Sequence, residues 1–362
     1  MALLTGEAGR AMRIQELEEV PMTIVGGFDV HRAQITFDYL VTESGEVRTG
    51  QIAPANRLVL RKWLRQFDGE DVAFAVEGCT GWRFVAEELR RAGHAVHLAE
   101  PADTRTLRGT KKRAKTDRAD ARHLRQLLMQ DRLPESWIPP VEVLEIRAKA
   151  RLYVALMDER RAWQQRMHAQ LYHQGVPAPG RNLLTEDGRE RLAKAKLSPA
   201  GRQVIDVGLS AVDHLTTLVD PLRDELKAFA PRQRGCRALM GIYGIGALIA
   251  PIVWAELGDT RRFSSSEKAV RYTGLDITVW SSDGKRHGPG HLSRQGPPAL
   301  RWALFEAAYI AARPSSPDHA YYLEVKTRQG SNRAALSVAR KLTRRAHHVL
   351  RDLGDTAWKK AT

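Results

Sequence analysis

The chain contains few cysteines and no long apolar stretch. Only two cysteines, Cys79 and Cys236, occur among its 362 residues, which excludes a disulfide framework and a cysteine-ligated metal site. No apolar run approaches the roughly eighteen residues of a membrane helix, and we expect no secretion signal because the N-terminal residues lack its apolar core. These absences argue against a membrane protein and a secreted one, and they predict a cytoplasmic protein.

Acidic residues are also in short supply. Lysine and arginine number 57 against 42 aspartates and glutamates, which gives a net charge of +15. Such an excess favours a polyanionic partner, because each neutralised phosphate releases condensed counterions. An anionic membrane surface is the alternative, but no basic amphipathic anchor is found. The charge therefore predicts a nucleic-acid-binding protein, associated with the nucleoid.

The first third of the chain has the pattern of a mixed α/β domain. Residues 1–21 show no core pattern and are predicted to be a flexible tail. Beyond them, β-rich segments span 23–30, 33–41 and 46–52, a helix 58–67, a buried strand 71–77, a helix 81–93 and a further strand 94–100. Short turns between the first three strands predict an antiparallel meander. We expect this domain to span residues 22–140.

The remainder of the chain is predicted to be mainly helical. Residues 102–116 carry six basic residues and one acid and are expected to be mobile, and a helix then runs from Asp117 to about Met129. Long helices at 141–173 and 200–228, joined by an insert, predict a helical or coiled-coil spacer. The expected segments are the spacer at 141–235, a C-terminal helical domain at 236–352 and a tail at 353–362.

Four carboxylates stand at positions that a sheet can bring together. Asp29 and Glu77 close two strands, and Asp117 and Asp120 begin a helix in the sequence TDRAD. Residues at i and i+3 share one helix face, and four converging carboxylates repel one another unless hard cations lie between them. The pattern predicts a two-Mg²⁺ site of the kind used for attack at phosphorus. The alternatives are a helix cap for Asp117 and an exposed strand end for Glu77.

A polar strip near residues 274–304 raises a second question. It contains the adjacent serines Ser281 and Ser282 and several glycines, and a helix rich in alanine and leucine follows. The strip is either a solvated loop or the carrier of an exposed nucleophile. Upstream, Gly244 and Gly246 flank Ile245 either as a tight turn between core helices or as a helix-hairpin-helix turn that approaches phosphates.

Two local patterns in this region predict purely structural roles. The serine run at 264–266, followed by Glu267, predicts a helix cap. Trp302, Phe305 and Tyr309 have helical spacing and are predicted to form a core stripe rather than a platform for stacked bases.

The motifs GFDVH, AVEGCTGW and AKTDRADARHLRQLL, in this order, resemble the DEDD, RuvC-like (RNase H-fold) domain of insertion sequence 110 family transposases. The resemblance covers about residues 22–150, and GIYGIGALIAPIVWAELGD with the following strip resembles the family's second domain. It implies a RuvC-like α/β domain, a long-helix spacer and a mainly α domain with a helix-hairpin-helix-like element. The implied tetrad, which would hold Mg²⁺, is Asp29, Glu77, Asp117 and Asp120.

The resemblance also implies a serine nucleophile. The family's serine is followed directly by glycine, whereas Asp283 intervenes here; counting from Gly274 places Ser282 at the nucleophile position, with Ser281 as the alternative. A covalent serine–DNA link would conserve the energy of the broken phosphodiester. The implied partners are DNA, a structured guide RNA and further copies of the chain in a dimer or tetramer. The residues expected to contact nucleic acid are Lys111, Lys112, Arg113, Lys115, Gly244, Gly246, Lys285, Arg286 and Arg294.

Two other functions are compatible with these residues. A metal-dependent nuclease or junction resolvase would use the carboxylates with water and would be indifferent to the serine. A non-catalytic nucleic-acid-binding scaffold would use the carboxylates only structurally. The presence of both the tetrad and the serine strip, in this order, favours the transposase.

Overall fold

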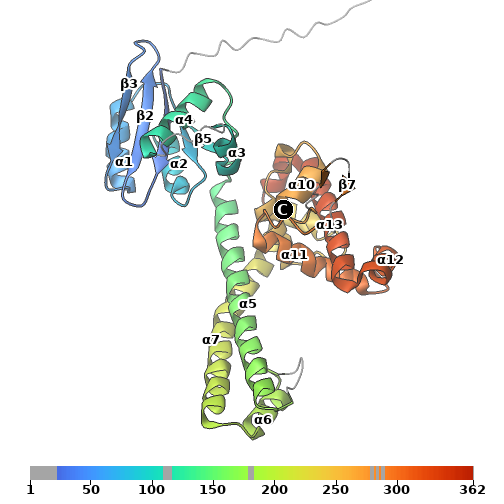
Figure 1. Ribbon diagram of the computed structural model, residues 1–362. Helices are drawn as coiled ribbons and strands as arrows, with labels where there is room; N and C mark the ends of the chain where they lie inside the picture. Colours follow the sequence, from blue (N-terminus) through green and yellow to red (C-terminus); the bar gives the residue numbers. More distant parts are fainter. Residues whose placement is uncertain are drawn as a thin grey trace, which may run out of the picture. The chain divides into compact units, whose positions relative to one another are not determined.

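The computed structural model describes residues 23–108, 116–177, 183–277, 281–282, 285–286 and 290–361. The chain divides into two units, Met1–Ile138 and Pro139–Thr362, and each is described by itself. Figure 1 shows their elements. Lys111, Lys112, Arg113 and Lys115, predicted to contact nucleic acid, lie outside the described residues.

A five-stranded mixed sheet forms the centre of the first unit. Its strands are β1 (Ile24–Val30), β2 (Ile35–Val41), β3 (Val47–Ile52), β4 (Val72–Glu77) and β5 (Ala95–Ala99), in the order β3-β2-β1-β4-β5. The first three strands pair antiparallel, as their short turns predicted, and β4 runs parallel to both β1 and β5. Strand β1 lies in the middle of the sheet, and all of its residues are buried.

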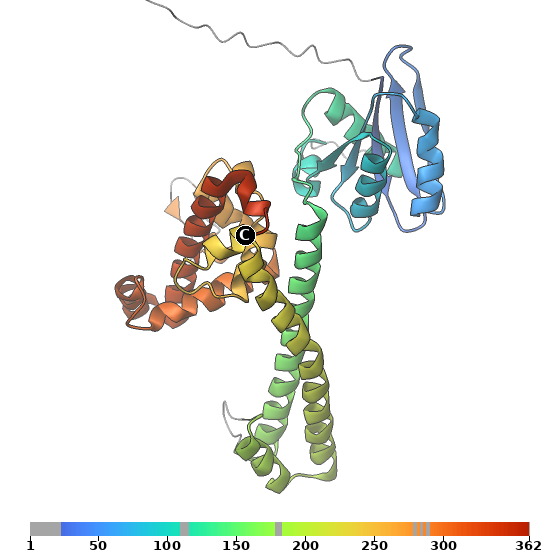
Figure 2. The same ribbon diagram turned by 180° about the vertical axis from the view of Figure 1, so that it is seen from behind.

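Helices cover both faces of this sheet. On one face, α1 (Arg57–Leu64), the following turn η1 (Arg65–Phe67) and α2 (Trp82–Arg91) enclose an aromatic core in which Phe28 stacks on Phe74. On the other face, Leu124 of α4 (Asp117–Met129) packs on Ala75 and Ala99 (Figures 1 and 2). The strands alternate between these layers, so that Phe28 faces the aromatic core while its neighbours face α4. The expected mixed α/β domain is confirmed.

One segment expected to be mobile is instead helical at its start. Residues 102–116 were predicted to be mobile because of their charge, but α3 spans Pro101–Thr106. Proline at the first helical position favours the helix, since its φ angle is already suitable and its missing N–H is not needed there. Thr104 is fully buried, so tertiary contacts stabilise this short helix.

Two long antiparallel helices dominate the first part of the second unit. Helix α5 spans Val141–His173 and α7 spans Pro199–Phe229, close to the predicted ranges, and α6 (Glu186–Lys194) lies in the insert between them. The two long helices lie side by side (Figures 1 and 2). A Cβ at Gly208 of α7 would lie 2.6 Å from Met167 Cγ, so the absence of a side chain there permits the close packing.

Shorter helices follow and share one core. They are η3 (Ala230–Arg232), α8 (Arg234–Leu239), α9 (Ile249–Leu257), η4 (Thr260–Arg262), α10 (Ser266–Thr273), α11 (Pro298–Tyr309), η5 (Ile310–Ala312), α12 (His319–Gln329), α13 (Ser331–Leu353) and η6 (Gly354–Trp358). Helix α9 is buried along its whole length. Ser265 caps α10 by accepting from the Lys268 N–H, which confirms the cap predicted from the serine run. None of the helices in the described ranges is both long enough and apolar enough to cross a membrane.

Two predictions for this unit are wrong. The aromatics of α11 do not form its core stripe: Tyr309 is 48% exposed, Trp302 and Phe305 are half-buried, and the buried face consists of alanines and leucines. Small residues occupy that face because α9 and α13 pack closely against α11. The expected tail at 353–362 is folded as far as residue 361, because Trp254 Nε1 donates to the Ala357 carbonyl and Ala361 N–H donates to the Arg232 carbonyl.

Candidate active site

The sheet register places Asp29 and Glu77 at one edge of the sheet. Phe28 pairs with Val76 in the parallel β1–β4 ladder, and each acid is the next residue along its strand. Because side chains alternate along a strand, both acids lie on the face opposite to the aromatic core, which is the face that α4 covers. The pKa of Cys79 is raised by burial and further by the charges of Glu77 and Asp29, as expected when both acids lie close to it.

Helix α4 contacts β1 directly at Gly27. A Cβ at this position would lie 2.2 Å from the Ala121 carbonyl oxygen and 2.8 Å from the Arg125 nitrogen. Farther along the helix, buried Arg125 donates from Nε to Asp38 Oδ1 at 2.5 Å, which ties α4 to β2. Contacts with two strands thus determine where the first turn of α4 lies.

Asp117 is available for a role other than capping. The cap of α4 is Thr116, whose hydroxyl accepts from the Ala119 N–H at 3.2 Å, so the cap interpretation of Asp117 is wrong. Its carboxylate instead accepts from Gln34 Nε2 at 3.4 Å and lies 3.5 Å from His31 Nε2. As a first-turn residue it is also favoured by the helix dipole.

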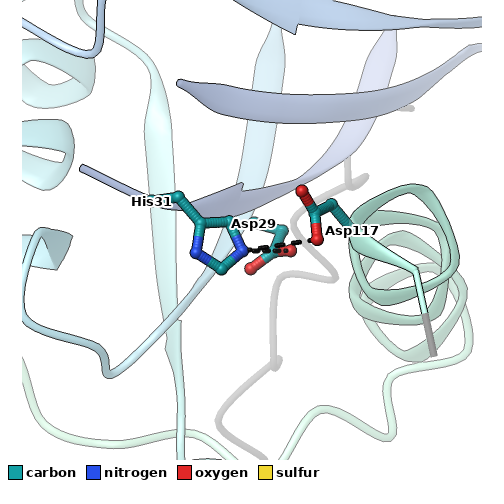
Figure 3. A group of neighbouring side chains, drawn as sticks. All are labelled: Asp29, His31 and Asp117. Atoms are coloured by element: carbon teal, nitrogen blue, oxygen red, sulfur yellow. Dashed lines mark hydrogen bonds and ion pairs between the residues drawn. The ribbon is translucent and has the colours of Figure 1, made fainter. Parts of the chain in front are cut away.

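Asp29, His31 and Asp117 form one cluster, called here the acidic cluster (Figure 3). One ligand atom from each residue lies within 4.8 Å of the others, and His31 Nε2 lies 3.2 Å from Asp29 Oδ2. The Asp29 side chain is 11% exposed, whereas those of His31 and Asp117 are about half exposed, at 53% and 45%. The cluster therefore has a buried side and an open side.

The electrostatics of the acidic cluster favour a cation. Burial raises the pKa of Asp29, the charge of His31 opposes the rise, and the charges of Asp120 and Asp117 add to it. Crowded carboxylates of this kind become more stable when a divalent cation is shared between them. Two carboxylates and an imidazole are all ordinary ligands for such an ion. The residues present therefore fit a divalent metal.

Asp120 is close to the acidic cluster and is paired with an arginine. It is buried, and Arg108 Nη1 donates to its Oδ1 at 2.5 Å. Arg108 and His31 were not among the predicted site residues. The position of His31, two residues after Asp29 in extended chain, could have indicated a shared face, whereas the position of Arg108 depends on the path of the chain after α3.

The serine strip forms a hairpin with an anchored base. Strands β6 (Ser281–Ser282) and β7 (Lys285–Arg286) pair antiparallel, and Ile277 pairs with Leu292 nearer the base. The backbone of Ser281, Ser282, Lys285 and Arg286 is described, but their side chains are not.

Hydrogen bonds close the base of this hairpin. The Arg294 N–H donates to the Gly274 carbonyl at 3.1 Å, and Arg301 Nη1 donates to the carbonyl oxygens of Gly296 and Thr273 at 2.6 and 3.3 Å. Hydrogen bonds therefore join the two ends of the strip beside α11.

The two glycines before α9 have different surroundings. Gly244 has a φ of +96°, and a Cβ there would lie 2.5 Å from the Ala307 carbonyl oxygen, so it packs on α11 as a tight core turn does. A Cβ at Gly246 would meet open space, and the Gly246 carbonyl accepts from Ile249 N–H and Ala250 N–H at the start of α9. Only Gly246 therefore has room beside it for a phosphate.

Two family models match this chain, in an order that corresponds to its two sites. Residues 27–174 match a transposase model of the IS110 DEDD type, and residues 236–323 match the model described as transposase of the IS116/IS110/IS902 family. The chain is a transposase, and both matched segments are similar to the IS110 family. The first match includes the acidic cluster, and the second includes the serine hairpin.

Curated relatives have the same kind of name. The transposase is 25% identical over 274 residues to the transposase for insertion sequence element IS1328 of Yersinia enterocolitica, across 75% of this chain and 81% of the relative. It is also 25% identical over 234 residues to the transposase for insertion sequence element IS1111A of Coxiella burnetii, across 63% of this chain and 64% of the relative. These relatives agree with the family models.

Proposed function

We propose that this transposase cuts and rejoins DNA through a covalent serine–DNA intermediate at Ser282. Mg²⁺ assists the reaction, held by the tetrad of Asp29, Glu77, Asp117 and Asp120. The observation that carries the proposal is the convergence of carboxylates from β1 and α4 at one edge of the sheet, in a chain whose second family match contains the serine hairpin.

We infer that the first unit is RuvC-like. The support is the strand order β3-β2-β1-β4-β5, with an antiparallel meander followed by two parallel strands. Further support comes from the acid on the central strand and the helix that brings two more acids to the same edge. Glu77 completes the tetrad by its register position beside Asp29.

The reaction proceeds by two exchanges at phosphorus. In the first, the Ser282 hydroxyl oxygen bonds to phosphorus, the bond from phosphorus to one strand oxygen breaks, and that oxygen takes up a proton as the serine loses one. In the second, a strand hydroxyl attacks the same phosphorus and releases the serine. Because a phosphodiester is exchanged for a phosphodiester, no hydrolysis is required.

The residues of the tetrad supply charge and orientation. Divalent cations, when bound, stabilise the negative charge that develops at phosphorus and activate the attacking hydroxyl. Asp29 lies on the central strand and Asp117 in the first turn of α4. Arg108 holds Asp120 in the same region.

An adduct assay tests this function. Wild type, Ser281→Ala, Ser282→Ala and Asp117→Ala are incubated with labelled element-end DNA, the element's own RNA and Mg²⁺, then separated on a denaturing gel. We expect protein-linked label in wild type and its loss in Ser282→Ala and Asp117→Ala. Loss in Ser281→Ala instead would transfer the nucleophile to that residue, and free cleaved ends without an adduct in every variant would establish the hydrolytic nuclease.

We also propose that a structured RNA encoded by the element guides this reaction and that several copies of the chain assemble on it. The support is the net charge of +15 and the basic segments at 105–115, 141–173 and 326–352. Omitting the RNA from the adduct assay is expected to remove the protein-linked label. Undiminished label without RNA would contradict guidance.

His31 is expected to hold the metal ligands in place. Because its Nε2 lies near both Asp29 and Asp117, we expect His31→Ala to weaken Mn²⁺ binding by about tenfold, the usual effect of losing such a partner. Electron paramagnetic resonance of free Mn²⁺ measures this without DNA. Gln34→Ala is the matched control, since the Gln34 side chain donates a long hydrogen bond of 3.4 Å to Asp117 and its backbone bond to His31 is kept. Equal affinities for the two variants would contradict this role.

A further inference from the structure

A cavity of about 660 Å³ lies within the second unit at the base of the serine hairpin. One wall is made by residues of the hairpin base, among them Ile277, Leu292 and Arg294. The opposite wall is made by the end of α12 and the start of α13, including Arg333 and Arg340. Its volume lies in the range of cavities that bind molecules of nucleotide size.

Positive charge gathers around this cavity, and the charge of Asp276 acts on one of its arginines, Arg340. Arg294, Arg333 and Arg340 contribute to its lining, and among the described residues no aspartate or glutamate does. Arg294 and Arg333 form no ion pair within the described part of the chain. The nearby acid Asp276 accepts a hydrogen bond from the Ser293 hydroxyl.

Other arginines of the same helix are paired. Arg345 donates to both carboxylate oxygens of Asp318, at 2.5 and 2.9 Å, and Arg344 lies 3.3 Å from Glu267. Arg333 and Arg340, by contrast, line the cavity and form no ion pair within the described part of the chain. Such a group of like charges is stabilised when an anion lies between them.

The backbone holds two of these arginines toward the cavity. Arg340 Nε donates to the Leu275 carbonyl at 2.7 Å, which fixes its guanidinium group beside the hairpin base. Arg294 has a φ of +54°, which is uncommon for a residue other than glycine. It is retained in this conformation by its own N–H, which donates to Gly274, and by the tight packing of Gly274 against it.

The uncharged part of the lining suits the rest of a nucleotide. Ile277, Leu292 and Leu336 are apolar, and Gln329 and Ser337 offer hydrogen-bonding groups. Phosphates bind arginine through charge-assisted hydrogen bonds, while sugar and base surfaces pack on apolar side chains. The lining thus combines the contacts that a single nucleic-acid strand requires.

We propose that this cavity binds the sugar–phosphate backbone of the DNA strand that is cut, close to the phosphodiester that the serine attacks. The inference rests on the proposed serine reaction for the identity of that strand. Ser282 follows Ile277 by five residues, so the serine lies at most about 17 Å along the chain from the cavity wall. At roughly 3.4 Å per nucleotide, the bound phosphate lies within about five nucleotides of the attacked one.

Binding of fluorescein-labelled single-stranded element-end DNA to the full-length protein in EDTA tests the cavity without any reaction. We expect Arg333→Gln to weaken binding about tenfold and to lower the slope of log K against log salt by about one. Arg351→Gln is the matched control, because Arg351 is exposed in the last turn of the same helix, and we expect a change of less than about twofold. Arg333→Lys should restore most of the affinity, and thermal unfolding confirms that each variant folds.

Methylphosphonate substitution then locates the contact. We expect one uncharged methylphosphonate linkage, within about five nucleotides of the adduct position, to weaken DNA binding by the wild-type protein. The same linkage should leave the DNA affinity of Arg333→Gln unchanged. Equal losses of DNA affinity for Arg333→Gln and Arg351→Gln, or a neutral linkage that weakens binding only when it lies farther from the adduct position, would each overturn the proposal. The comparison of Arg333→Gln with Arg351→Gln needs no adduct, so its failure is separate from a failure of the serine reaction.

Discussion

Asp29→Asn is expected to lower Mg²⁺-dependent DNA cleavage by at least about a thousandfold. Asparagine keeps the shape of the side chain but removes the buried charge that, with Asp117, would hold the cation. Metal ions contribute several kcal/mol of charge stabilisation in such reactions, and about 4 kcal/mol corresponds to a thousandfold change in rate. Single-turnover cleavage of labelled element-end DNA measures the loss.

The same substitution should stabilise the metal-free protein. Burial and the charges of Asp120 and Asp117 raise the pKa of Asp29, so the folded protein binds this proton more tightly than the unfolded chain does. The contribution of Asp29 to stability therefore falls as the pH rises through its raised pKa. Without that charge, we expect Tm at neutral pH to rise by about 2 °C in EDTA and to respond little to added Mg²⁺.

The control for Asp29→Asn is an acid at the opposite edge of the sheet. Asp68 is exposed and lies near His94, which precedes β5, so Asp68→Asn should leave both cleavage and the effect of Mg²⁺ on Tm unchanged. Wild-type cleavage by Asp29→Asn, or an unaltered Mg²⁺ response of its Tm, would refute the assignment of Asp29 as a metal ligand.

Gly27→Ala is expected to reduce both the cleavage rate and the stability of the protein. The added Cβ would lie 2.2 Å from the Ala121 carbonyl oxygen, so α4 must move away from β1 at an expected cost of about 1–3 kcal/mol. The same movement displaces Asp117 and Asp120 from Asp29, and a shift of about 1 Å can lower a rate about a hundredfold. Thermal unfolding and single-turnover cleavage at 25 °C measure the two effects on one preparation.

Gly45→Ala is the control for Gly27→Ala, because it also adds a methyl group that lowers stability but does not move α4. Gly45 has a φ of +71° and open space around it, so alanine there costs about 1 kcal/mol of conformational strain but displaces nothing. We expect this variant to cleave at the wild-type rate at 25 °C. Cleavage by Gly27→Ala at that rate as well would mean that contact between β1 and α4 does not position the acids.

The elements with strong periodicity were predictable from the sequence. The long helix was expected at 141–173 and spans Val141–His173, and the strands of the first unit were expected close to their observed bounds. Both features follow from local patterns that are repeated over many residues. The short helix α3 was missed because its six residues carry no periodic pattern and its stability depends on the burial of Thr104.

The acidic cluster was only partly predictable. Asp29 and Asp117 were predicted to converge because a strand end and a helix start can meet at one edge of a sheet, and the structure places them together with His31. His31 was not among the predicted site residues, although its position two residues after Asp29 indicates a shared face. The pairing of Arg108 with Asp120 joins residues twelve positions apart, and no pattern in the intervening sequence indicates it.

By itself, the sequence determined the order of strands and helices in the first unit and the two long helices, because alternation, helical spacing and turn residues act locally. The tertiary structure alone decided which face of α11 is buried, how closely α4 approaches β1 at Gly27 and which arginines line the cavity. These features depend on contacts between segments far apart in the chain, and the free energy of such contacts is set by packing and charge pairing that no local window contains.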